Sequence, residues 1–211
     1  MDIDFDRCLG AVTRRVEEAE HAGQPVRRVV LERGYATDPD DLWQAITDPG
    51  RLARWFLPVT GTLRPGGHYQ LEGNAGGTIE HCEPPSRLDL TWEFAGGMSW
   101  LEVRIRADGD GHARLSLAHV CPVDAFWERY GPGAAGLGWD LGLLGLGLHL
   151  DGAPRPDEAE LAADPAGQAF IADASADWGR AAVQAGTGST AADLAVRRTT
   201  AFYTGQPEPD A

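Results

Sequence analysis

Apolar residues in the first quarter of the chain pass from an alternating spacing to a helical one. Val29, Leu31 and Tyr35 are separated by even numbers of residues, which predicts a half-buried strand over residues 29–35. The segment DPDDLWQAITDP that follows, residues 38–49, opens with an aspartate and a proline, a pairing favoured where a helix begins. We therefore predict a strand, a turn and a capped helix that stops at the closing Asp-Pro pair.

Later apolar residues alternate in short runs separated by turn residues, which is typical of an antiparallel meander. The turns RPGG at residues 64–67 and DGDG at residues 108–111 contain residues that preset or free the backbone angles a tight turn needs. Counting the first strand, the meander has about seven strands. The further strands are predicted over residues 59–63, 68–72, 76–83, 87–94, 99–107 and 112–121.

The leucine-rich segment GLGWDLGLLGLGLHL, residues 136–150, is apolar on most sides when drawn as a helix. Such a pattern is typical of a helix enclosed by a sheet. Gly138, Gly142 and Gly145 share one side, although each glycine costs roughly 0.5–1 kcal/mol relative to alanine inside a helix. Either another element approaches the backbone closely there, or the missing side chains leave room for a ligand. The alternation of leucine and glycine also fits a strand, so the residues alone leave both structures open.

Apolar residues at helical spacing also precede the central region. Leu9, Val12, Val16 and Ala19 predict an amphipathic helix over residues 6–22. Its apolar stripe is expected to pack either on the outside of the domain or on a second subunit.

Two helices are predicted towards the carboxyl end. An Asp-Pro pair at residues 164–165 predicts an N-capped helix that ends near residue 185. Thr190 and Asp193 have the spacing of a capping box, which predicts a last helix through Phe202.

The large side chains Trp178, Phe202 and Tyr203 are expected to be covered. The terminal helices would then dock on the mouth of a cavity, on the back of the core, or on a second copy in a homodimer. The predicted organisation is an N-terminal helix over residues 1–25, a central domain over 26–152, a helical extension over 153–205 and a disordered tail over 206–211.

Several segments resemble, in order, the activator of Hsp90 ATPase homologue (AHSA1-like) family of the START/Bet v 1-like superfamily. Besides the first strand and helix, they are RLARWF at 51–56, RPGGHYQLEG at 64–73, PPSRLDLTWEF at 84–94, DGDGHARLSLAH at 108–119 and GW at 138–139. The resemblance implies an α+β helix-grip fold, in which a curved antiparallel sheet wraps a long helix near the carboxyl end and leaves a cavity. It also favours a helix for the leucine-rich segment.

Composition narrows the classes of partner. The 211 residues are 43% apolar and carry a formal charge of −14, so the chain repels nucleic-acid phosphates and anionic membrane surfaces. No apolar run approaches the length of a membrane span. The three cysteines lack paired spacing and the acidic amino terminus does not resemble a signal peptide, so we expect reduced thiols in the cytoplasm.

Few residues have the spacing of a reactive site. His119 and Cys121 point to one side of a predicted strand, but a zinc site needs three or four ligands, so we expect no metal and no cofactor. Glu80 and His119 are the candidates for a general acid or base, on the condition that they share an enclosed cavity. The alternative is a solvent-facing glutamate and a histidine that belongs to the core.

Aromatic residues favour an apolar ligand. The cavity is predicted to be lined by Trp55, Phe56, Trp92, Trp100, His119, Trp139 and Gly142. An aromatic pocket with few polar groups suits a small hydrophobic or aromatic molecule, although the same side chains would also serve as simple core. Binding such a molecule is our leading hypothesis. A cyclase/aromatase-like enzyme acting on a hydrophobic substrate is the alternative, and an Hsp90-type chaperone-associated regulator, suggested by the family resemblance, is the third.

Overall fold

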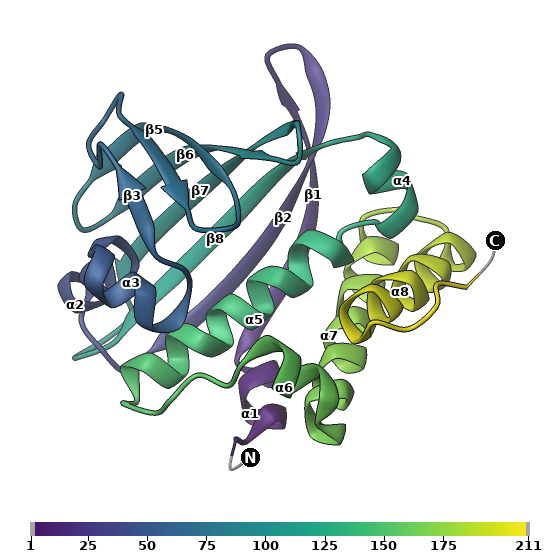
Figure 1. Ribbon diagram of the computed structural model, residues 1–211. Helices are drawn as coiled ribbons and strands as arrows, with labels where there is room; N and C mark the ends of the chain where they lie inside the picture. Colours follow the sequence, from purple (N-terminus) through teal and green to yellow (C-terminus); the bar gives the residue numbers. More distant parts are fainter. Residues whose placement is uncertain (1–2, 210–211) are drawn as a thin grey trace. The chain divides into compact units, whose positions relative to one another are not determined.

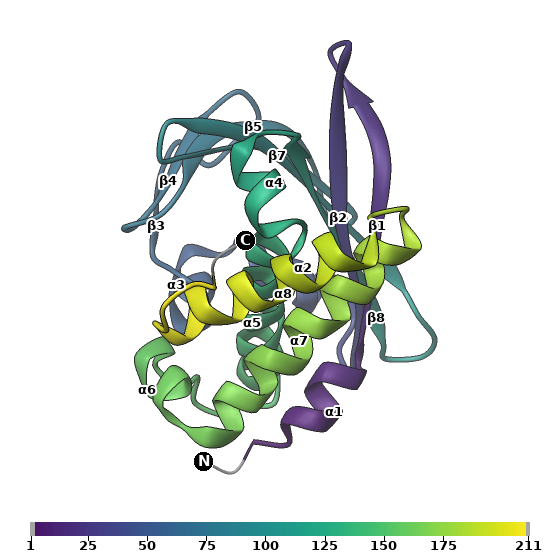
Figure 2. The same ribbon diagram turned by 90° about the vertical axis from the view of Figure 1, so that its right-hand side faces the viewer.

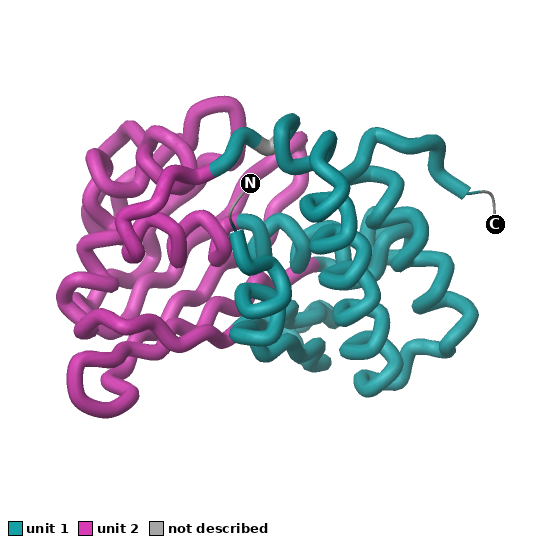
Figure 3. The backbone as a smooth tube through the Cα atoms, turned by 90° about the horizontal axis from the view of Figure 1, so that it is seen from below, with its two compact units in different colours: residues 1–31, 122–141, 156–211 teal, residues 32–121, 142–155 magenta. Residues whose placement is uncertain are grey.

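The computed structural model describes residues 3–209 of the chain. The chain divides into two compact units (Figure 3), unit 1 with residues 1–31, 122–141 and 156–211, and unit 2 with residues 32–121 and 142–155. The strands are β1 (Val12–His21), β2 (Gln24–Tyr35), β3 (Val59–Gly61), β4 (His68–Leu71), β5 (Gly76–Glu83), β6 (Arg87–Phe94), β7 (Gly97–Ala107) and β8 (Ala113–Pro122). The helices are α1 (Phe5–Gly10), α2 (Pro39–Thr47), α3 (Pro49–Trp55), α4 (Ala125–Tyr130), α5 (Gly133–Leu150), α6 (Glu158–Ala163), α7 (Pro165–Gln184) and α8 (Ser189–Thr204).

The strands form one eight-stranded sheet in the order β1-β2-β8-β7-β6-β5-β4-β3 (Figure 1). From β3 to β8 each strand pairs antiparallel with the next one along the chain, as the turn residues predicted. The leucine-rich segment is helical and forms most of α5. The predicted α+β helix-grip fold is therefore confirmed, including the choice of a helix over a strand for this segment. Among the described residues, no helix has the length and hydropathy needed to cross a membrane.

In unit 2, two aspartates start successive helices. The Asp38 carboxylate accepts a hydrogen bond from the Asp41 backbone N–H at 2.8 Å, and Asp48 caps α3 in the same way through the Arg51 N–H. Each aspartate is followed by a proline, whose fixed φ suits the first helical position. The predicted helix therefore ends at Asp48, as expected, but the same Asp-Pro pair also starts α3, which the sequence analysis did not anticipate.

The second half of α5 contacts strand β2 within unit 2. The Arg33 guanidinium donates to the Leu143 carbonyl at 2.8 Å, and it lies so close to Gly147 that a Cβ there would be 2.6 Å from Arg33 Nη2. A Cβ at Gly145 would lie 2.7 Å from the Trp55 carbonyl oxygen. Of the two explanations for the glycines of this helix, close approach of a neighbour therefore accounts for Gly145.

In unit 1, residues 12–21 form a strand. The predicted helix over residues 6–22 is therefore wrong, except where the short helix α1 covers its beginning. Val12 and Val16 also fit a two-residue repeat, since Val12 is buried and Val16 is half-buried while Thr13 and Arg15 are exposed. Ala22 and Gly23, with φ of 49° and 78°, form the tight turn that returns the chain as β2. Valine and threonine favour strands once a partner strand lies alongside.

The helices of unit 1 pack around α7. Helices α7 and α8 lie side by side (Figure 2), and α1 meets α7 through Phe5 and Phe170, whose ring centroids are 5.5 Å apart. The Asp164 carboxylate caps α7 as predicted. The predicted capping box at Thr190 is wrong, because the N-cap of α8 is Gly188, two residues earlier, and no side chain caps this helix.

A buried ion pair joins three segments of unit 1. The Asp140 carboxylate on α5 accepts from the Arg14 guanidinium at 2.8 Å and from the Trp178 indole N–H at 2.8 Å. Arg14 also donates to Asp177 at 3.0 Å. The side chains of Arg14 and Asp140 are 5% and 0% exposed, so each charge depends on the other.

The terminal aromatic residues differ in exposure. Trp178 is fully buried, as expected, whereas Phe202 is 54% exposed, contrary to the expectation that it is covered. The chain beyond α8 contacts α4, since the Glu208 carboxylate accepts from the Tyr130 hydroxyl at 2.5 Å and pairs with Arg129. Residues 206–209 of the predicted tail thus include a defined contact, while residues 210–211 lie outside the described residues.

Candidate functional site

The pairing register assigns residues of unit 2 to the two faces of the sheet. His119 on β8 pairs with Leu101 on β7, and Ser99, two residues before Leu101, pairs with Trp92 on β6. Directly paired residues in an antiparallel sheet point to the same face, and so do residues two apart in one strand. His119, Ser99 and Trp92 therefore share one face with Leu101, which is 4% exposed.

The polar centre of this face is a contact between Ser99 and His119. Ser99 Oγ lies 2.7 Å from His119 Nε2, and the Ser99 hydroxyl is also 3.1 Å from the Trp92 carbonyl oxygen, to which it can donate. The Trp92 and His119 rings meet nearly edge to face, with centroids 5.9 Å apart. Burial lowers the pKa of His119 to about 4, because desolvation penalises the charged imidazolium. At neutral pH the group is uncharged.

Strand β6 presents an apolar row on the same face. Leu90 is 9% exposed, Trp92 is half-buried and Phe94, at the end of the strand, is 54% exposed. Phe94 pairs with Gly97 across the tight turn formed by Ala95 and Gly96. The row therefore leads from an exposed aromatic ring at the hairpin tip to a buried leucine.

Two of the predicted site residues do not join this face. Trp100 pairs with Thr91 and Val120, which places its side chain on the opposite face of the sheet from His119. The expectation that Trp100 and His119 line one cavity therefore needs correction, because adjacent strand residues point to opposite faces. Glu80 is exposed on β5, so it lacks the enclosure that its predicted acid or base role required.

Trp55 and Phe56 lie at the end of α3, where their polar groups serve the fold. The Trp55 indole N–H donates to the Ala45 carbonyl at 2.9 Å, which ties α3 to α2. Arg155 donates to the carbonyls of Trp55 and Phe56 at 3.1 and 2.8 Å. Trp55 is buried and Phe56 is half-buried. Their place in a ligand cavity stays a prediction.

The remaining predicted cavity residues belong to different units. Trp139 is buried in unit 1 and Gly142 is buried in unit 2. Ser99 is the residue that the sequence analysis missed. A signal was present in the hairpin, because fixing the two-residue turn at Ala95 and Gly96 also fixes the pairing of Ser99 with Trp92. Within residues 3–209, no group of three or more histidine, cysteine or acidic side chains is placed to hold a metal ion.

The fold and this sheet face define a helix-grip domain with an apolar face and a neutral polar centre. The family model described as "Activator of Hsp90 ATPase homolog 1-like protein" matches residues 36–141, just over half of the 211 residues. The chain belongs to this family. No curated protein matches it.

Solved structures support the same fold. The crystal structure of CalU16 from Micromonospora echinospora is 28% identical, with a TM-score of 0.68, and the match covers 81% of this chain and 98% of CalU16. The similarity therefore extends beyond the residues that the family model matches. An Hsp90 activator from Plasmodium falciparum, PFC0360w, is 22% identical over 61% of this chain and 99% of its own, with a TM-score of 0.52. EF2215 from Enterococcus faecalis is 16% identical over 84% and 95%, with a TM-score of 0.60.

Proposed function

We propose that the protein binds a small, neutral, hydrophobic or aromatic molecule on the sheet face of unit 2 that carries Trp92, Ser99 and His119. The observation that carries the proposal is the neutral Ser99–His119 contact within an apolar surface. A neutral imidazole and a hydroxyl can each donate or accept one hydrogen bond without the desolvation cost of a charge. Such a face favours a ligand with one or two polar atoms on a largely apolar body.

The apolar row on β6 supports a route to this face. Isolated exposed apolar residues are common on proteins, but Phe94 continues a row whose other members become progressively buried. A ligand that enters at the hairpin tip would meet Phe94 first, then Trp92, and then the polar pair. This arrangement supports a ligand with an aromatic body whose polar atom would lie near His119.

Calorimetric titration with 1-naphthol tests the proposal. The wild-type protein should bind it saturably, and Trp92→Ala should weaken binding about tenfold because an aromatic contact and its buried area are lost. Trp100→Ala is the matched control, since Trp100 lies on the opposite face and should leave the affinity within about twofold. Equal weakening by both substitutions, or no saturable binding by the wild-type protein, contradicts the proposal.

A second candidate function is a cyclase/aromatase-like enzyme, favoured by the 2.7 Å contact between Ser99 and His119. A neutral buried imidazole can accept a proton from a carbon acid, as a general base does. The Kemp elimination of 5-nitrobenzisoxazole tests this ability, because the step removes one proton from carbon as the ring N–O bond breaks. An enzyme of this kind should accelerate it saturably, with the acceleration lost in His119→Gln and kept in Trp100→Ala. A rate equal to that of buffer excludes His119 as an accessible base.

A further inference from the structure

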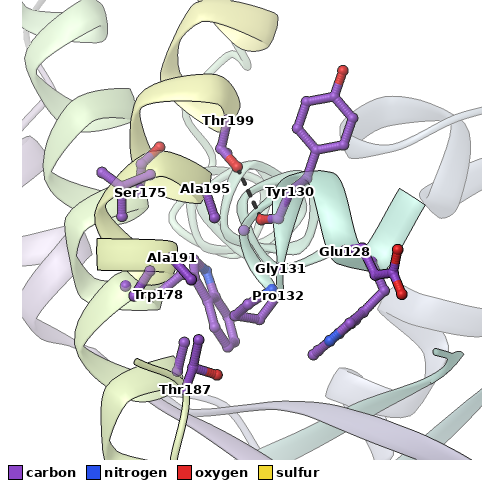
Figure 4. Close-up of a pocket in the computed structure, with 16 residues that line it drawn as sticks. Glu128, Tyr130, Gly131, Pro132, Ser175, Trp178, Thr187, Ala191, Ala195 and Thr199 are labelled. Atoms are coloured by element: carbon purple, nitrogen blue, oxygen red, sulfur yellow. Dashed lines mark hydrogen bonds between the residues drawn. The ribbon is translucent and has the colours of Figure 1, made fainter. Parts of the chain in front are cut away.

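Unit 1 contains a pocket that shares no residue with the sheet face of unit 2 (Figure 4). It lies between α4, the start of α5, α7 and α8, and its volume is about 130 Å³. A protein cavity of about 150 Å³ is large enough to bind benzene. The pocket is slightly smaller than that, which limits a ligand to a single aromatic ring with at most one small substituent.

Small side chains on α7 and α8 create this space. Ala182 on α7 and Ala191 and Ala195 on α8 line the pocket. Larger residues at these positions would fill the volume, as residues in a well-packed core do. The indole of Trp178 supplies one wall and is held in place by its hydrogen bond to Asp140, so it offers a rigid aromatic surface.

Two buried hydroxyls line the pocket from neighbouring helices. Thr199 is 0% exposed, and its hydrogen bond to the Tyr130 carbonyl is 3.4 Å long (Figure 4), beyond the 2.5–3.0 Å of an ordinary O–H···O bond. Ser175 is also 0% exposed and donates to the Ile171 carbonyl at 2.7 Å, which leaves its oxygen able to accept. While it donates, the Thr199 oxygen keeps lone pairs that can accept a hydrogen bond from a ligand.

The charge of the lining excludes anions. Among the described residues that line the pocket, Glu128 is the one charged residue; it is exposed, and in Figure 4 its carboxylate points away from Thr199. No cation is present in the lining to pair with a carboxylate or phosphate, and burying such an anion without a partner is costly. The fitting ligand is neutral.

We propose that this pocket is a second binding site, for a neutral single-ring aromatic molecule that carries one hydroxyl or similar hydrogen-bonding group. The ring lies against Trp178 and the polar group exchanges a hydrogen bond with Thr199. The site is independent of the function proposed for unit 2, because none of the residues that line it belongs to that unit.

Phenol, benzene and benzoate are the probes that test this site. They share one ring and differ in the polar group. In the full-length protein, tryptophan indole NMR signals should shift saturably with phenol, with an affinity about fivefold higher than for benzene, the effect of one hydrogen bond. Benzoate should not bind. Tight binding of benzoate, or no saturable shift with phenol, overturns the proposal.

Substitutions on α8 test whether the probes bind in this pocket. Thr199→Val removes the hydroxyl and should reduce the affinity for phenol to that for benzene, whereas Thr200→Val, at a neighbouring threonine outside the lining, should leave it unchanged. Ala195→Leu should abolish the shift of the Trp178 indole signal with both probes by filling the space. Trp92→Ala should leave both affinities unchanged, which separates this site from the one proposed on the sheet. Unchanged phenol affinity in Thr199→Val and Ala195→Leu overturns the assignment.

Discussion

The two units differ in how they bury polar side chains. In unit 1, Arg14 and Asp140 form a buried ion pair whose further hydrogen-bond partners include Asp177 and Trp178. In unit 2, Ser99 and His119 meet as neutral groups on an apolar sheet face. A charge buried in a protein needs a fixed set of hydrogen-bonding partners. A neutral pair can exchange one partner for another at a smaller desolvation cost. The first cluster therefore stabilises the fold, and the second is the one that we propose faces a ligand.

The largest expected effect comes from breaking the charged cluster. Asp140→Asn leaves the Arg14 guanidinium buried with a single carboxylate, so the free energy of unfolding should fall by about 3–5 kcal/mol. Urea denaturation measures this change in the free energy of unfolding. Asp177→Asn is the matched control, because the Asp177 side chain is 22% exposed and should cost about 1 kcal/mol. Similar losses from both substitutions would show that the cluster does not depend on Asp140.

The stability contributed by the Ser99–His119 pair should instead depend on pH. The pKa of His119 is about 4 in the folded protein and near its ordinary value of 6.5 in the unfolded chain, so the unfolded state binds more protons between these values. Stability contributed by the neutral histidine is therefore present above pH 6.5 and is lost as the pH falls towards 4, by about 3 kcal/mol in total.

Urea denaturation of the wild-type protein and of His119→Gln at several pH values measures this loss, as the difference between the pH dependence of their free energies of unfolding. The variant should have a shallower slope between pH 6.5 and 4, while His68→Gln, at an exposed histidine on β4, should keep the wild-type slope. Identical slopes in all three proteins would mean that His119 is not buried as a neutral group.

Substitution of two glycines in α5, one in each unit, should have the smallest effects on stability. A Cβ at Gly136 would collide with the rigid indole of Trp178, so Gly136→Ala should cost about 1–3 kcal/mol. A Cβ at Gly147 would lie 2.6 Å from the Arg33 guanidinium, which can shift because it is the far end of a long side chain. The shift would strain its hydrogen bond to the Leu143 carbonyl, and the gain in helix propensity of about 1 kcal/mol should offset part of that cost. Thermal unfolding of the two variants checks the order, and a more stable Gly136→Ala protein would contradict it.

Residues with local signals were predicted well. Proline-capped helices and glycine turns depend on nearby residues, so the meander followed from local sequence. The leucine repeat of α5 fitted both a helix and a strand, and the family resemblance decided for the helix. Strand β1 was mistaken for a helix because Val12 and Val16 satisfy both repeats, and only pairing with β2 decides between them.

The site was harder to predict because it depends on register. Trp100 and Ser99 are adjacent, and a shift of one residue would exchange which of them faces His119. His119, Trp92 and Trp100 were all predicted to line one cavity, whereas the register places Ser99 beside His119 and Trp100 on the opposite face. The pocket of unit 1 had no local signal at all, since its lining joins residues that are far apart in the chain.

The most direct test of the central claim is an NMR spectrum of the seven tryptophan indole N–H groups during titration with 1-naphthol. Assignments come from single tryptophan substitutions. The account predicts a saturable shift of the Trp92 signal, with Trp100 nearly unmoved, and loss of the shift in His119→Leu. A shift of Trp100 with Trp92 unmoved, or saturable binding that moves neither, would contradict a ligand site on the face of Ser99 and His119.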